Sequence, residues 1–108
     1  MKSGIKYKAG DVVLVQVQFA DSFQVKTRPA VVLYAHLGNI IIAGITSNTL
    51  MQGIPLSKKD GIIKDSIIKT NYLFTTVPQF IKKKLTTLTN KKRKEVLQTM
   101  QVHLAHLQ

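Results

Sequence analysis

The sequence predicts a mainly β fold with α: a small antiparallel barrel or sheet with one C-terminal helix packed against it. Before Pro78, short apolar and β-branched segments alternate with turn signals. After Pro78 the pattern changes, and apolar residues recur at helical spacing. The length of 108 residues suits one small domain, so we expect a single domain over residues 1–108.

The first two strands are predicted from their apolar patterns. Residues 11–19 begin as an apolar run and then alternate apolar with polar side chains, which is typical of a strand that is half-buried at one end. Residues 20–27 are polar and are expected to form a loop. Residues 30–34 are the next apolar run, and Pro29 stands at its start, where a missing N–H is tolerated.

The third strand is predicted at residues 40–46, which are rich in β-branched side chains. The Gly-Asn dipeptide at residues 38–39 is a turn signal, so the second and third strands should form a hairpin. Further short β segments are expected at residues 54–56, 66–69 and 72–75.

An amphipathic helix is predicted over residues 90–106. Thr89 can accept a hydrogen bond from an N–H group of the first turn and thus act as the N-cap. Five residues are spaced so that they share one face of this helix: Val96, Met100, His103, Leu104 and Leu107. We expect this face to cover the barrel, which argues against a role at a membrane surface.

The strongest functional signal is the charge. Sixteen Lys and Arg residues face five acidic residues, which gives a formal net charge of +11. A domain this basic attracts polyanions, and nucleic acid is the usual polyanion because binding releases condensed counterions. The alternative is a basic, solvated surface that binds nothing in particular.

Composition also excludes several classes of protein. The N-terminal residues carry lysines but no apolar segment of a signal peptide, and no apolar run reaches the roughly 18–20 residues of a membrane helix. There is no cysteine, so disulfides and thiolate metal sites are excluded. We therefore expect a cytoplasmic protein without a membrane partner.

Several motifs, in their order and spacing, resemble the MazF/PemK (Kid-like) family of toxins from type II toxin–antitoxin systems. The resemblance spans about residues 9–107. The motifs are GDVVLV at residues 10–15, RPAVVL at 28–33, ITS at 45–47, Gly61 followed by DSII at 65–68, and LFT at 73–75 followed by KL at 84–85 and the closing helix. The chain differs from the family pattern at Lys64, where an arginine often precedes Asp-Ser, and in a short loop without glycine at residues 20–27.

The resemblance implies an SH3-like (CcdB/PemK-like) barrel that forms a homodimer. It also implies a sequence-specific endoribonuclease, or mRNA interferase, that cuts single-stranded RNA without a metal or other cofactor and is neutralised by a cognate antitoxin. The 2′-hydroxyl of the RNA would attack the adjacent phosphate, and the products would be a 2′,3′-cyclic phosphate and a 5′-hydroxyl. Such chemistry depends mainly on alignment and on electrostatic stabilisation of the transition state.

Arg28 is the first candidate catalytic residue. The chain has only two arginines, Arg28 and Arg93, among many lysines. The planar guanidinium can bind two phosphate oxygens at once, whereas the lysine ammonium is a point charge. The resemblance implies a catalytic arginine at position 28, with acid–base duties among its family roles. The chemistry of the guanidinium favours charge stabilisation instead, and the alternative is an arginine in a surface salt bridge beside a proline turn.

Thr46 is the second candidate catalytic residue, because its hydroxyl at the end of an apolar strand can donate to a phosphate oxygen. The alternative is a threonine that only favours the β conformation. Ser47 either binds RNA as well or merely opens the following loop.

Other residues are candidates for RNA binding. Lysines near the predicted strand ends could follow the phosphate backbone, and aromatic side chains near Arg28 could stack on unpaired bases. These candidates are Lys26, Lys58, Lys59, Lys64, Phe19 and Phe23, with a place in the core as the alternative for Phe19. The basic stretch at residues 82–94 is either a second phosphate-binding face or a solvated helix start.

The general base is left open by the sequence. The candidates are Asp21, Asp60, Asp65 and His36, and we expect His36 to lie in a solvated turn away from Arg28. His103 and His106 are three residues apart on the predicted helix, but two imidazoles without carboxylates nearby make a weak metal site. No metal site is expected.

Two other functions remain open. A non-catalytic SH3-like nucleic-acid-binding module would keep the barrel and the lysines but would need neither Arg28 nor Thr46. A degenerate toxin retained for regulation would keep the antitoxin contact alone.

Overall fold

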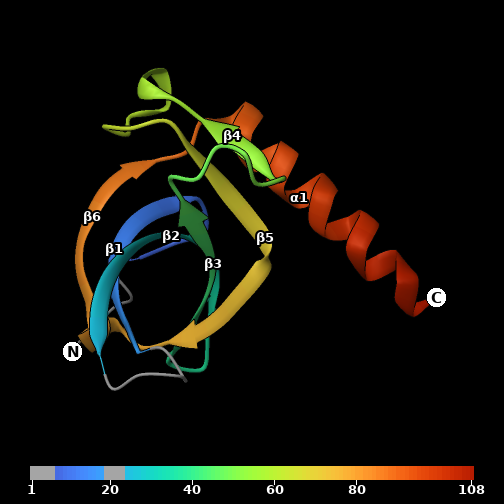
Figure 1. Ribbon diagram of the computed structural model, residues 1–108. Coiled ribbons are helices and arrows are strands. Elements are labelled where there is room, and N and C mark those ends of the chain that lie inside the picture. Colours follow the sequence, from blue (N-terminus) through green and yellow to red (C-terminus); the bar gives the residue numbers. More distant parts are fainter. Residues whose placement is uncertain (1–6, 19–23) are drawn as a thin grey trace.

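The computed structural model describes residues 7–18 and 24–108, which form one curled antiparallel sheet with a helix beside it (Figure 1). The strands are β1 (Asp11–Gln18), β2 (Val25–His36), β3 (Asn39–Thr46), β4 (Ile54–Leu56), β5 (Ser66–Thr76) and β6 (Ile81–Thr87). The helices are α1 (Asn90–Leu104) and three 3-10 helices, η1 (Lys58–Asp60), η2 (Pro78–Phe80) and η3 (Ala105–Leu107). The strand order is β4-β5-β3-β2-β1-β6 with antiparallel neighbours, so the predicted fold class is confirmed as a six-stranded half-barrel with a C-terminal helix.

The hairpin of β2 and β3 is confirmed, and its turn lies one residue earlier than predicted. Leu37 and Gly38 both have positive φ angles, 52° and 83°. Two positive φ angles in a two-residue loop are the backbone of a type I′ turn, whose twist matches that of the strands. Asn39 already pairs with His36 and therefore belongs to β3.

The continuous apolar runs of β1, β2 and β3 are explained by burial on both faces of the sheet. Successive side chains of a strand point to opposite faces. One face therefore contributes Val12, Val31, Ala43, Ile45, Ile54, Leu56 and Ile68 to a core cluster with Leu88, which follows β6, and Val96 of α1. The other face contributes the second core cluster, Val13, Val15, Ala30, Val32, Ile40, Ile42 and Ile81.

The helix begins as predicted but covers less of the sheet than expected. The Thr89 side chain accepts a hydrogen bond from the backbone N–H of Lys92 at 3.2 Å, which confirms the N-cap. Val96 is buried and Met100 is half-buried, whereas residues 101–108 are all exposed. The second half of α1 thus projects beyond the sheet (Figure 1). Within the described part of the chain, no helix is both long and apolar enough to cross a membrane.

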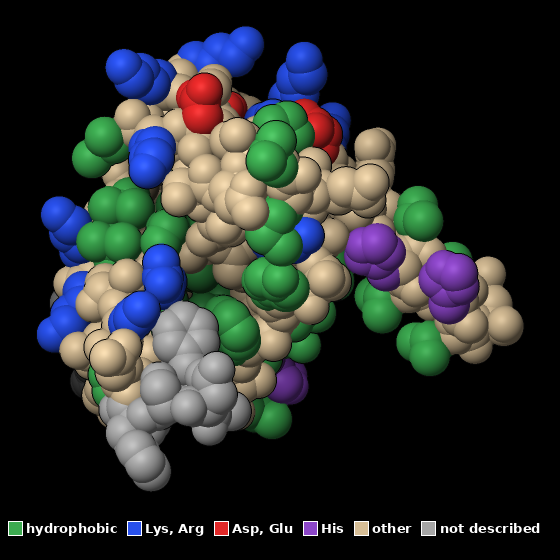
Figure 2. Space-filling view, in the orientation of Figure 1, with side chains coloured by type: hydrophobic (Ala, Val, Ile, Leu, Met, Phe, Trp, Pro, Cys, Tyr) green, Lys and Arg blue, Asp and Glu red, His purple; other side chains and the backbone are tan. Residues whose placement is uncertain are grey.

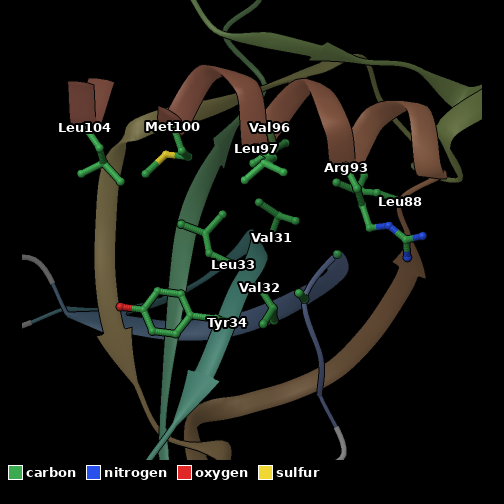
Figure 3. Close-up of a pocket in the computed structure, with 12 residues that line it drawn as sticks. Val31, Val32, Leu33, Tyr34, Leu88, Arg93, Val96, Leu97, Met100 and Leu104 are labelled. Carbon is green, nitrogen blue, oxygen red and sulfur yellow. The ribbon is translucent and has the colours of Figure 1, made fainter. Parts of the chain in front are cut away.

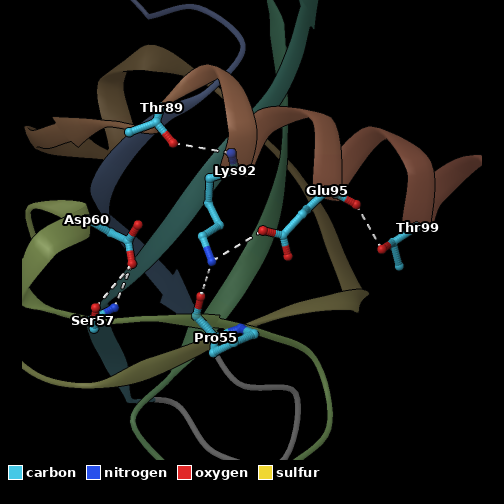
Figure 4. A network of polar contacts seen from close by, with 7 residues as sticks. All are labelled: Pro55, Ser57, Asp60, Thr89, Lys92, Glu95 and Thr99. Atoms are coloured by element: carbon cyan, nitrogen blue, oxygen red, sulfur yellow. Dashed lines mark hydrogen bonds and ion pairs between the residues drawn. The ribbon is translucent and has the colours of Figure 1, made fainter.

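Polar contacts tie the first half of α1 to β4 (Figure 4). The Nζ atom of Lys92 donates a hydrogen bond to the Pro55 carbonyl at 2.8 Å and lies 3.5 Å from the Glu95 carboxylate. Nearby, the Asp60 carboxylate accepts the backbone N–H of Ser57 at 2.8 Å. Lys92 and Asp60 therefore have structural roles at this end of the sheet.

Two predicted boundaries were wrong. Residues 25–27 belong to β2 instead of a loop, so Pro29 lies inside the strand. The ladder between β2 and β3 begins only at Ala30, so Pro29 lies where β2 pairs with β1 alone and a missing N–H is tolerated. Residues 66–76 form one strand instead of two, and this strand stays continuous although its pairing with β3 is irregular between Ile68 and Leu73.

Strand β6 was missed by the sequence analysis. Its lysines Lys82, Lys83 and Lys84 are exposed, so the segment lacks an apolar pattern, yet it pairs with β1 along the edge of the sheet. Charged edge strands are common because they prevent pairing with other chains. Figure 2 shows Lys and Arg side chains gathered on the left side of that view, where Figure 1 places β6.

Candidate functional site

A cleft of about 420 Å³ opens where β1, β2, β3 and β5 meet, and we call it the Arg28 cleft. Its lining consists of Val15, Val17, Arg28, Pro29, Ala30, Gly44, Ile45, Thr46, Ser47, Lys64, Ser66, Tyr72 and Phe74. The charged side chains of this lining are Arg28 and Lys64, and no carboxylate is among the described residues that form it. The cleft therefore suits an anionic ligand.

The strand register explains why Arg28 and Thr46 meet in this cleft. Ala30 lies opposite Gly44 across the β2–β3 ladder, so the two residues share a face of the sheet. Arg28 is two residues before Ala30, and Thr46 is two residues after Gly44. Because the strands are antiparallel and side chains alternate, both residues project from the same face at the same end of the sheet.

The hydroxyl of Thr46 is held by the loop that follows β3. Its Oγ1 atom accepts the backbone N–H of Asn48 at 3.1 Å, and the Asn48 side chain in turn accepts the N–H of Leu50 at 3.1 Å. Thr46 is half-buried, whereas Arg28 is exposed. Ser47 also lines the cleft, since β3 ends at Thr46 and the alternation of side chains stops there.

Of the other residues predicted to bind RNA, some lie in or next to the Arg28 cleft and others lie away from it. Lys64 lines the Arg28 cleft. Lys26 is exposed and lies opposite the cleft residue Val17 on β1. Lys58 and Lys59 lie in η1, and Lys59 borders a separate pocket, so neither lines the cleft. Phe19 and Phe23 lie outside the described residues.

A family model described as "PemK-like, MazF-like toxin of type II toxin-antitoxin system" matches residues 8–104. The chain belongs to this family. The resemblance predicted from the short motifs is thereby confirmed over most of the sequence. No curated protein matches the chain in sequence.

Solved structures of MazF proteins share the fold. The Mycobacterium tuberculosis toxin MazF-mt6 has a TM-score of 0.66 and 18% identity, with 82% of this chain and 89% of that chain covered. A mycobacterial endoribonuclease in complex with its cognate antitoxin has a TM-score of 0.70 and 11% identity, with 91% and 92% covered. The MazE-MazF structure from Deinococcus radiodurans has a TM-score of 0.74 and 17% identity, with 94% and 98% covered.

None of the described residues that line the cleft is a histidine, an aspartate or a glutamate, the usual general bases. His36 lies at the far end of the β2–β3 hairpin, as expected. Asp60 accepts the N–H of Ser57, and Asp65 borders the same separate pocket as Lys59. Asp21 lies outside the described residues.

The two helix histidines lie away from the Arg28 cleft. His103 shares a hydrogen bond of 3.1 Å with Thr70 of β5, and His106 is exposed at the end of the chain. The described residues contain no group of three or more His, Cys, Asp or Glu side chains that could hold a metal ion.

The sequence analysis missed two aromatic residues of the cleft, Tyr72 and Phe74. The sequence predicts only a β segment at residues 72–75, and its aromatic candidates for stacking are Phe19 and Phe23, which lie nearest Arg28 in sequence. Two aromatic side chains at alternate positions of one strand share a face, and this spacing was the available signal.

Proposed function

We propose that this toxin-family protein is a sequence-specific endoribonuclease that cuts single-stranded RNA without a metal ion. The observation that carries the proposal is the convergence of Arg28 and Thr46 in one cationic cleft. The proposed reaction is attack of a 2′-hydroxyl on the neighbouring phosphate, which releases a 5′-hydroxyl and leaves a 2′,3′-cyclic phosphate.

Each residue supports this reaction by a contact with the phosphate. The Arg28 guanidinium stays protonated and donates to two nonbridging oxygens, where negative charge accumulates in the transition state. The Thr46 hydroxyl accepts the Asn48 N–H through a lone pair, which leaves its proton to donate to an oxygen. Lys64 adds a positive charge from the side of β5, and Lys26 and Ser47 extend the RNA contacts along the cleft.

We further propose that a cognate antitoxin neutralises the protein in the cytoplasm by covering this cleft. One similar structure is an endoribonuclease in complex with its cognate antitoxin, which supports the proposal. A formal charge of +11 and a cleft lining with two cations favour an antitoxin segment with acidic residues.

We also propose a homodimer, formed through an apolar groove of about 360 Å³ between β2 and α1 (Figure 3). Tyr34 and Leu33 point into this groove from β2, and Leu97, Met100 and Leu104 point into it from α1. Tyr34, Leu97 and Leu104 are each more than half exposed. Burying these side chains against a second copy would stabilise the dimer. Sedimentation as a monomer at micromolar concentration would contradict this part of the proposal.

The test of catalysis is incubation of the purified protein with mixed-sequence single-stranded RNA in EDTA, followed by mapping of the fragment ends. We expect the protein to cut at a short recurring sequence and to leave cyclic-phosphate ends. The Arg28→Ala variant should make no such cuts. Lys91→Ala removes the same charge from an exposed position on α1 and should cut normally. Tight, salt-sensitive RNA binding without cleavage would contradict the proposal. It would favour a non-catalytic binding module or a degenerate toxin.

A further inference from the structure

The wall of the Arg28 cleft contains two partly exposed aromatic rings that the proposed phosphate chemistry does not use. Tyr72 and Phe74 of β5 are 43% and 41% exposed, and both line the cleft. Phe74 lies opposite Ile42 of β3, a residue of the second core cluster, so its ring faces the same side of the sheet as Arg28. The rings therefore line the same cleft as Arg28 and Thr46.

The pairing of β5 with β3 is irregular next to Tyr72. Ala43 pairs with Leu73 and Ile45 pairs with Ile68, so a single β3 residue, Gly44, faces the β5 residues from 69 to 72. Extra residues of this kind re-aim side chains and occur often beside active sites. Tyr72 is two residues before Phe74 and therefore lies on the same face of β5, where both rings line the cleft beside these extra residues.

Gly44 leaves the space next to both rings without a side chain. It lies inside β3 without a positive φ angle, so its backbone does not require glycine. An added Cβ would lie 3.5 Å from the Tyr72 Cβ and 3.7 Å from the Phe74 ring, which is ordinary contact. A glycine within a strand weakens it and often marks the close approach of a ligand.

Lys69 is a buried neighbour of the Tyr72 ring. It is 7% exposed, and its Nζ atom donates a hydrogen bond to the Gln52 carbonyl at 2.7 Å. The same atom lies 5.3 Å from the centroid of the Tyr72 ring, within cation–π range. An ordered ring loses less entropy when a flat ligand stacks on it.

We propose that Tyr72 and Phe74 form a platform on which an unpaired RNA base next to the cleaved phosphate stacks. The inference rests on the proposed function and extends it to base recognition. Stacking on aromatic rings is the usual way in which proteins hold unpaired bases. Gly44 places no side chain between the base and the rings, Lys69 lies against the Tyr72 ring, and Arg28 and Thr46 bind the phosphate in the same cleft.

The experiment compares base-bearing with abasic RNA of the same length, so that stacking is separated from phosphate binding. Binding is measured in an Arg28→Ala background, where the RNA is not cut, and Tyr72→Leu and Phe74→Leu are added one at a time. Each should weaken binding of base-bearing RNA by about 5- to 100-fold, as removal of a stacking ring does elsewhere. Binding of abasic RNA should stay unchanged, and Tyr72→Phe should restore the tighter binding.

Phe80→Leu is the matched control, because Phe80 is 51% exposed but lies outside the cleft lining. Equal losses for base-bearing and abasic RNA, or no loss for either, would overturn the platform. A wild-type protein that cuts no RNA, but shows the base-dependent loss, would refute the proposed catalysis and leave the platform standing. Gly44→Ala with unchanged melting temperature and weaker binding of base-bearing RNA alone would support the role of the open space.

Discussion

The Arg28 cleft and the β2–α1 groove are similar in size and opposite in chemistry. Their volumes are about 420 and 360 Å³, and β2 lines both. Arg28, Pro29 and Ala30 from the first half of β2 line the cleft, whereas residues 31–34 line the groove. The cleft joins cations and hydroxyls, while the groove is lined almost entirely by apolar side chains. The chemistry of the lining, and not the size of the hollow, therefore distinguishes the two regions, and substitutions can separate their roles.

The largest expected effect is that of Arg28→Ala on cleavage in the cleft. Loss of a charged donor to the transition state should lower the single-turnover cleavage rate by about 100-fold or more. Arg28→Lys keeps the charge but cannot bind two oxygens in parallel, so it should recover only part of the rate. Because Arg28 is exposed, the thermal midpoint of unfolding should stay unchanged. Cleavage by Arg28→Ala at the wild-type rate would remove this residue from the mechanism.

Leu88→Ala should show the opposite pattern on the groove side. Leu88 is 3% exposed, lines the groove and belongs to the core cluster under α1. Truncation of a buried leucine costs about 2–5 kcal/mol, because apolar contact is lost and a cavity remains. Urea denaturation should report this loss, while folded protein at low temperature should cleave RNA normally. A cleavage defect in fully folded Leu88→Ala protein would show that the two regions are coupled.

Thr46→Val should produce an intermediate effect that is confined to the cleft. Valine keeps the shape and the β preference of threonine but removes the hydroxyl, so a lost hydrogen bond to phosphate should slow cleavage about 10-fold, or about 1.4 kcal/mol. Thr46→Ser keeps the donor and should retain most of the rate. The comparison is made by single-turnover cleavage under conditions where both variants are folded by circular dichroism. Equal rates for valine and threonine would assign Thr46 to strand formation alone.

The parts of the fold that follow from local sequence were predicted, and those that depend on distant pairing were missed. The apolar runs of β1, β2 and β3 are buried on both faces, so composition alone indicated strands there. β6 is rich in lysine and is a strand only because β1 provides a partner for its backbone. Tertiary pairing of this kind leaves no periodic signal in the segment itself.

The same distinction applies to the candidate site. Arg28 and Thr46 stand at the beginning and the end of consecutive antiparallel strands, so a hairpin alone brings them together. Lys58 and Lys59 were predicted from their nearness to strand ends in sequence, yet η1 places them outside the cleft lining. Tyr72 and Phe74 share a face of β5 by their spacing, but they line the cleft only because β5 pairs with β3 in the folded sheet.

The smallest expected effect is on the salt dependence of RNA binding, and it distinguishes a lysine inside the Arg28 cleft from a lysine outside it. Lys64 lines the cleft, whereas Lys59 borders the separate pocket, and both side chains are exposed. If Lys64 contacts one phosphate, Lys64→Ala should reduce the slope of log binding constant against log salt by about 0.7 for single-stranded RNA. Lys59→Ala removes the same charge and should leave the slope unchanged, apart from a weak, uniform effect of net charge. Titrations at several salt concentrations in the Arg28→Ala background measure both slopes. Equal reductions would mean that the RNA path extends from the cleft across η1, because counterion release counts only the phosphates that the protein neutralises.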